Sequence, residues 1–244
     1  MRRAFRIVAG AFAAFAIVFS VPFLIGSFVS EDEEIHLFHN IGGLAVYGVI
    51  LGGALLALAI APDRNVATFQ GLALGSLGAL VGGLLSGDVI SGFWFFPALV
   101  VVVLFALHPD RASLLRTGRR RIGFLALVLL AAIPLVAYAL THARLQSEGL
   151  VSDPHVELHH YSGQAAGSLM LLLFAVAPGL GAVGWRLAAW LAGAAMAILG
   201  LGSIVYPDHV SAFDTVWAWL ALAWSLAFMT LAWLGARDPA EATA

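Results

Sequence analysis

The sequence predicts an all-α, multi-pass membrane protein with eight transmembrane helices. Of its 244 residues, 61% are hydrophobic and only 11% are charged, whereas soluble domains carry about 25% charged residues. Eight uncharged stretches are each long enough to cross about 30 Å of hydrocarbon as a helix. Strands are not expected, because an open sheet leaves backbone groups unpaired in lipid. These observations exclude a soluble globular enzyme.

The expected spans follow one another with short connections. They cover residues 7–29, 41–61, 66–85, 89–107, 122–140, 165–183, 187–206 and 216–234. The first stretch is longer than the apolar core of a signal peptide and has no clear cleavage motif after it, so we expect a retained anchor. Gly184, Trp185 and Arg186 form nearly the whole connection between the sixth and seventh spans.

The distribution of arginine predicts the orientation. With the N-terminus inside, eleven arginines fall on the cytoplasmic side: Arg2, Arg3, Arg6, Arg64, Arg111, Arg116, Arg119, Arg120, Arg121, Arg186 and Arg237. Arg144 alone falls outside. Because basic residues favour the cytoplasmic face, both termini are expected in the cytoplasm. The simplest location is the plasma (inner) membrane of a prokaryote.

The chain also divides into two similar halves. Residues 1–110 form a first four-helix unit, 111–121 a basic cytoplasmic linker, and 122–244 a second four-helix unit with a short tail. Polar landmarks recur in the same order in both units: His39 with His160, Asp88 with Asp208, and Trp94 with Trp217. Four spans per unit predict a parallel repeat about an axis along the membrane normal.

Small residues are expected where helices approach closely in lipid. The candidates are Gly42, Gly43, Gly52, Gly53, Gly71, Gly75, Gly78, Gly82 and Gly83.

Several classes of function are excluded by residues that the chain lacks. It has no cysteine, which excludes disulfides and cysteine-ligated zinc or iron–sulfur sites. Its twelve basic residues are all arginine, which excludes a lysine Schiff base and a P-loop lysine. A net charge of −2 gives no support for nucleic-acid binding. No ionisable residue lies in the middle of an expected span, which argues against a proton-coupled pump.

The polar residues gather on the expected outer face, and the histidine spacing there predicts a metal site. The candidate ligands are His36, His39, Asp88, His155, His159, His160, Asp208 and His209. A simpler explanation is that polar residues collect in loops wherever a membrane protein has them. Nitrogen and oxygen ligands without sulfur suit zinc or copper(II).

Two signals place these histidines on helices. Ser30 and Glu33 form a capping box, and Asp153 before Pro154 predicts an N-cap followed by a first-turn proline. On such helices His36 and His39 would share one face, and His155 and His159 another.

The spacings Glu33 to His36 and Glu157 to His160 resemble the Glu-x-x-His motif of di-metal carboxylate bundles. That resemblance implies one further carboxylate from each of two other helices, which Asp88 and Asp208 could supply from the outer loops.

Three functions remain open at this point. The first is a divalent zinc or copper site used for metal handling or metal-dependent hydrolysis. The second is a non-catalytic accessory subunit of a larger membrane complex, since the chain has no soluble domain and many aromatic side chains on its spans. The third is a haem held by His39 and His160. The sequence names no substrate for any of them.

Overall fold

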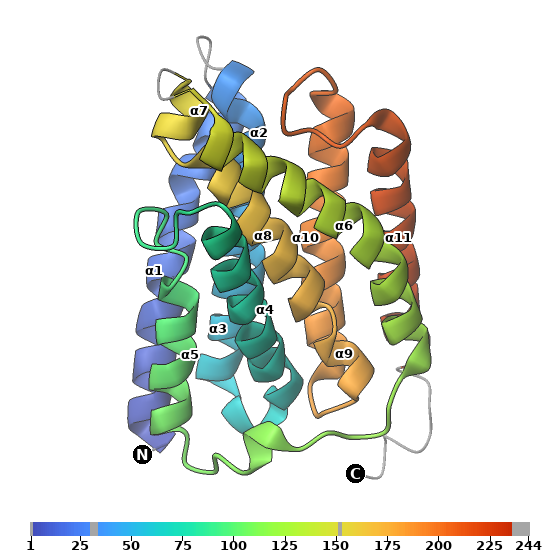
Figure 1. Cartoon of the computed structure of the whole chain (residues 1–244). Coiled ribbons are helices and arrows are strands. Elements are labelled where there is room, and N and C mark those ends of the chain that lie inside the picture. The colour runs from blue at the N-terminus through green and yellow to red at the C-terminus, as the bar shows by residue number, and fades with distance from the viewer. Residues whose placement is uncertain (1, 30–33, 151–152, 236–244) are drawn as a thin grey trace.

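The computed structural model describes residues 2–29, 34–150 and 153–235, with the side chains of 27–29 and 34–37 left undescribed. Within these ranges the chain is all helical and contains no strand (Figure 1). Seven of the described helices are long and apolar enough to cross a membrane. The chain is therefore a multi-pass membrane protein that requires a lipid bilayer around it.

The helices follow the chain in two series. The first contains α1 (Arg2–Val29), α2 (Glu34–Gly43), the π-helical η1 (Leu44–Gly52), α3 (Gly53–Ile60), η2 (Pro62–Arg64), α4 (Val66–Leu85), α5 (Phe96–Leu107) and η3 (Ser113–Leu115). The second contains α6 (Ile122–Glu148), α7 (Pro154–Glu157), α8 (His160–Phe174), α9 (Ala177–Leu180), α10 (Trp185–Val205) and α11 (Thr215–Leu234). The segments α2, η1 and α3 form one rod, because no turn separates them.

The fourth expected span, residues 89–107, is not a continuous helix. Residues 86–95 fold into turns, and α5 begins only at Phe96 and has 12 residues. Gly87 and Phe93 adopt left-handed backbone angles with φ of 68° and 56°, which interrupt any helix. Pro97 then occupies the first turn of α5, where its missing N–H costs nothing. The prediction of eight spanning helices is thus not confirmed, and the expected 89–107 helix is wrong in its first half.

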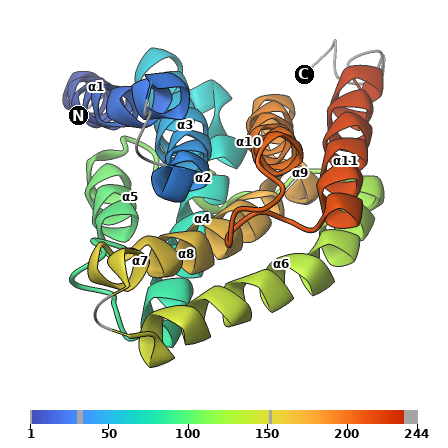
Figure 2. The same cartoon turned by 90° about the horizontal axis from the view of Figure 1, so that it is seen from above.

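The helix α8 lies at the centre of the bundle, with α4 along one side of it (Figure 2). Gly78 and Gly82 of α4 face the α8 backbone, and a Cβ at Gly82 would lie 2.5 Å from Ala166 Cα. Only glycine permits this approach. The predicted glycine seam is confirmed at these two positions.

Both ends of the bundle are defined by the helix directions. The helix α1 begins and α11 ends at one end, shown at the bottom of Figure 1. The opposite end carries α7, the first turns of α2 and α8, and the loop 206–214 between α10 and α11. The histidines meet at this second end.

Candidate metal centre

Four histidine rings from separate parts of the chain converge at the end of the bundle that carries α7. His39 comes from α2, His155 from α7, His160 from the start of α8 and His209 from the loop 206–214. The ring centroid of His39 lies 5.0 Å from that of His155, 4.4 Å from that of His160 and 4.9 Å from that of His209. We refer to these four residues as the histidine cluster.

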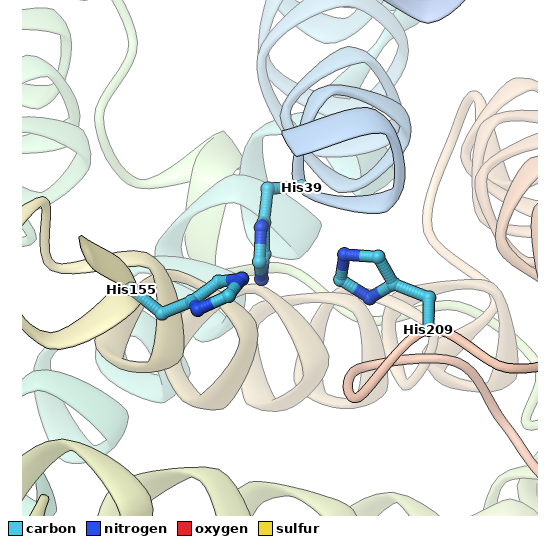
Figure 3. Close-up of side chains that lie close together, drawn as sticks. All are labelled: His39, His155 and His209. Carbon is cyan, nitrogen blue, oxygen red and sulfur yellow. The ribbon is translucent and has the colours of Figure 1, made fainter. Parts of the chain in front are cut away.

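Three members of the cluster are arranged so that they could hold one metal ion. Ring nitrogens of His39, His155 and His209 all lie within 4.8 Å of one another (Figure 3). His39 is buried, while the other two are partly exposed. In a tetrahedral zinc site with Zn–N bonds of about 2.0–2.1 Å, ligand nitrogens are about 3.4 Å apart. Any separation in the group that is wider than this would have to shorten for an ion to bind.

Asp153 holds His155 in a fixed orientation. Its Oδ1 accepts the backbone N–H of His155 at 2.9 Å and lies 2.8 Å from Nδ1 of the same residue. Burial alone would raise the pKa of Asp153, but these hydrogen bonds outweigh it and lower the pKa below its ordinary 3.8. The ionised carboxylate therefore binds Nδ1, so that Nε2 would be the ligand atom for a metal, as in carboxylate–histidine–zinc triads. The predicted N-cap at Asp153, with Pro154 in the first turn, is confirmed.

Ser211 connects the other two histidines. Its backbone N–H donates to His209 Nδ1 at 3.0 Å, and its hydroxyl oxygen lies 3.1 Å from His39 Nε2. Because Nδ1 of His209 accepts a hydrogen bond, a neutral ring carries its proton on Nε2. Binding an ion at His209 must either displace the Ser211 amide or shift this proton.

His159 belongs to a second network, separate from the cluster. The helix α7 ends at Glu157, and His159 has a left-handed φ of 59° before α8 begins. The expectation that His155 and His159 share one helical face is therefore wrong. His159 Nδ1 lies 2.8 Å from the buried Asp88 Oδ2, which also accepts the Ser162 hydroxyl at 2.6 Å. Trp94 Nε1 donates to the same hydroxyl oxygen at 3.2 Å.

The remaining candidate ligands lie elsewhere. Asp208 and Glu157 are exposed, and neither belongs to the His39–His155–His209 group. His36 is on α2, but its side chain is outside the described part, as are Ser30 and Glu33. The sequence reasoning missed the contribution of Ser211, for which the signal was its position two residues after His209.

The arrangement does not suit a haem between His39 and His160. Two axial imidazoles lie on opposite faces of a planar macrocycle, whereas these two rings have centroids 4.4 Å apart. No macrocycle fits between rings at that separation.

A pocket of about 240 Å³ adjoins the cluster and reaches His39, His159 and His160. The cluster therefore borders a space in which a small molecule or part of a lipid can lie.

Comparisons with protein-family models, curated proteins and solved structures find no match. The functional interpretation therefore rests on the geometry of the histidine cluster and its surroundings.

Proposed function

We propose that the protein binds a divalent transition metal, zinc or copper, through His39, His155 and His209. The observation that carries this proposal is the convergence of their ring nitrogens within 4.8 Å. The three residues come from α2, α7 and the loop 206–214, so local sequence does not explain their proximity. Chance gatherings of polar loop residues are mostly solvated, whereas His39 is only 7% exposed.

The surroundings support an ion rather than a solely structural cluster. Asp153 holds the ring of His155 through Nδ1, which is the role of an outer carboxylate in metal sites. The side chains of the triad supply nitrogen without sulfur, which suits zinc and copper(II) better than copper(I).

Hydrolysis is the chemistry that such a site supports best. Three protein ligands leave a fourth position of a tetrahedral ion for water, and zinc lowers the pKa of that water to about 7. The adjoining pocket gives a substrate direct access to His39. We therefore favour a metal-dependent membrane hydrolase over a protein that only stores or transfers metal.

We further propose that the chain is a parallel duplication with both termini in the cytoplasm. In this duplication α1 corresponds to α6, the α2–α3 rod to α8, α4 to α10, and α5 to α11. Each helix contact within the first half then has a counterpart within the second. The rod packs on α1 as α8 packs on α6, and α1 contacts α5 as α6 contacts α11. Across the halves, α4 packs on α8 as α10 packs on η1. A twofold axis along the membrane normal requires these pairings.

Elemental analysis of protein purified without a histidine tag tests the metal proposal. After equilibration with buffered zinc, we expect about one zinc per chain, and loss of this zinc in His39→Ala. The matched control is His159→Asn, which removes a neighbouring imidazole while placing asparagine, a residue that tolerates left-handed angles, at φ 59°.

The two variants separate the interpretations. Zinc retained in His159→Asn but lost in His39→Ala supports the triad. No zinc or copper in the wild-type protein, or equal zinc in both variants, overturns the proposal.

A further inference from the structure

The pocket beside the histidine cluster has a polar end and an apolar end. His39, Asn40 and His160 line one end, and Phe19, Val46 and Leu199 line the other. Its volume of about 240 Å³ exceeds the roughly 150 Å³ that accommodates a benzene ring in an apolar protein cavity. The occupant therefore has room for more than solvent.

The polar end lies at the mouth of the bundle. His39 and Asn40 approach it from α2, and His160 approaches it from the first turn of α8. The rings of His39 and His160 are 4.4 Å apart at this end. Hydrogen-bonding groups of a ligand would be recognised here, directly beside the proposed ion.

The apolar end extends into the membrane-spanning part of the bundle. From His160 to Ser168 the pocket follows α8 over eight residues, or about 12 Å of helix. Val46 of η1 and Leu199 of α10 line this deeper part. Gly163 and Gly167 also line the α8 side of the pocket, between the side chains of His160, Gln164 and Ser168.

The pocket borders both water and lipid. Phe19 of α1 is 44% exposed on the membrane-facing surface, and Leu158 is 53% exposed at the mouth. The deeper lining is mostly apolar, with Gln164 and Ser168 of α8 as its polar members. A hydrocarbon chain entering past Phe19 finds an environment like that of the bilayer.

We propose that this pocket binds a single-chain amphiphile, with its polar group at His39 and His160 and its hydrocarbon chain along Val46 and Leu199. The inference rests on the proposed function and assigns its substrate class: a lipid or lipid-like molecule whose hydrolysable polar group lies beside the ion. Hydrolysis would add water across a carboxylic ester or amide, so that its carbonyl carbon gains the oxygen and its leaving group gains the proton.

Photo-cross-linking in vesicles tests the pocket without requiring activity. The probe is a twelve-carbon fatty acid with a diazirine near its methyl end, added to vesicles of phosphatidylethanolamine and phosphatidylglycerol that contain the full chain. We expect cross-links mapped by peptide mass spectrometry at Val46 and Leu199, competed by unlabelled fatty acid. Non-competed cross-links on exposed helix faces report the bulk bilayer.

Two pocket-filling variants act from opposite walls. A Cβ at Gly163 meets Trp94 at 3.5 Å, an ordinary contact, so Gly163→Leu places its remaining atoms in the pocket. Val46→Phe fills the pocket from η1. Gly10→Leu is the control, because a Cβ there meets only Ala59 Cβ, at 3.8 Å. We expect the competed cross-links to fall about tenfold in both filled variants, a loss of about 1.4 kcal/mol in binding, and to persist in the control.

Zinc content and chromatographic behaviour of each variant keep the outcomes distinct. Wild-type zinc with no competed cross-link overturns the amphiphile pocket and leaves the metal proposal standing. Competed cross-links in a protein that binds no metal overturn the proposed function and leave the pocket standing. Equal cross-linking in folded filled variants and control also overturns the pocket.

Discussion

Replacing Asp153 by asparagine should weaken metal binding while leaving the fold intact. The carboxylate caps α7 through the His155 backbone N–H at 2.9 Å and binds His155 Nδ1 at 2.8 Å. It also accepts the Tyr161 hydroxyl at 3.3 Å, a contact that the amide group of asparagine can keep. Asparagine caps helices about as well as aspartate, but it lacks the charge that orients and strengthens a ligating imidazole. Loss of such an outer carboxylate lowers metal affinity about 10- to 100-fold, or about 1.4–2.7 kcal/mol.

Competition with a calibrated chelator measures this change. We expect Asp153→Asn to bind zinc 10- to 100-fold more weakly, roughly, and its metal-free thermal stability to match the wild type. Asp153→Ala should show the same loss of affinity and, because the cap is removed, a further loss of about 1 kcal/mol in the metal-free protein. Wild-type zinc affinity in Asp153→Asn would refute the assignment of His155 as a ligand oriented by this carboxylate.

Three further predictions concern the packing, the second network and the ion. Gly82→Ala should lower the free energy of unfolding in detergent by about 1–3 kcal/mol, because its Cβ would meet the Ala166 backbone at 2.5 Å. The control Gly10→Ala should raise it by about 0.5–1 kcal/mol. Equal stabilities of the two variants would contradict close packing of α4 on α8 at Gly82. Asp88→Asn should lower the free energy of unfolding by about 1.5–3 kcal/mol, because its hydrogen bonds to Ser162 and His159 are weakened, but it should leave the zinc content unchanged. A loss of zinc from the folded variant would show that the Asp88 network and the histidine cluster are not independent. Chelation of a site saturated at 100 times its Kd should remove about 2.7 kcal/mol of stability, seen as a lower melting temperature, and an unchanged melting temperature would argue against a site in the folded state.

Hydropathy predicted most of the fold because lipid restricts what each apolar stretch can become. Seven of the expected spans correspond to described helices, since an isolated helix satisfies its own backbone. The stretch 89–107 is also apolar, but its first residues fold into turns instead of a helix, and hydropathy does not distinguish the two. Asp88 is buried against Ser162, a residue 74 positions away, and this bond holds the turns of 86–95 in place. Long-range polar contacts of this kind leave no periodic signal.

The site was predicted in composition but not in grouping. The sequence offered eight candidate ligands, among which are His39, His155, His160 and His209 of the cluster. It paired His155 with His159, however, on the assumption of one uninterrupted helix. The left-handed angle at His159 turns the chain, so that His160 joins the cluster instead. The pocket could not be predicted at all, because its walls come from seven separate parts of the chain and its existence depends on how they pack.

The two polar networks lie on different sides of the first turn of α8, and the proposed duplication gives a reason. His160 and Ser162 are two residues apart, which rotates their side chains by about 200° around the helix. The loop 206–214 approaches the His160 side through His209, whose ring is 4.9 Å from that of His39. The turns of 86–95, which would be its counterpart in the first half, meet the Ser162 side through Asp88 and Trp94. In a symmetric pair the turns of 86–95 would approach His160 as the loop 206–214 approaches His39. Because Asp88 instead bonds to Ser162, the two loops differ, and a single histidine cluster remains beside the pocket.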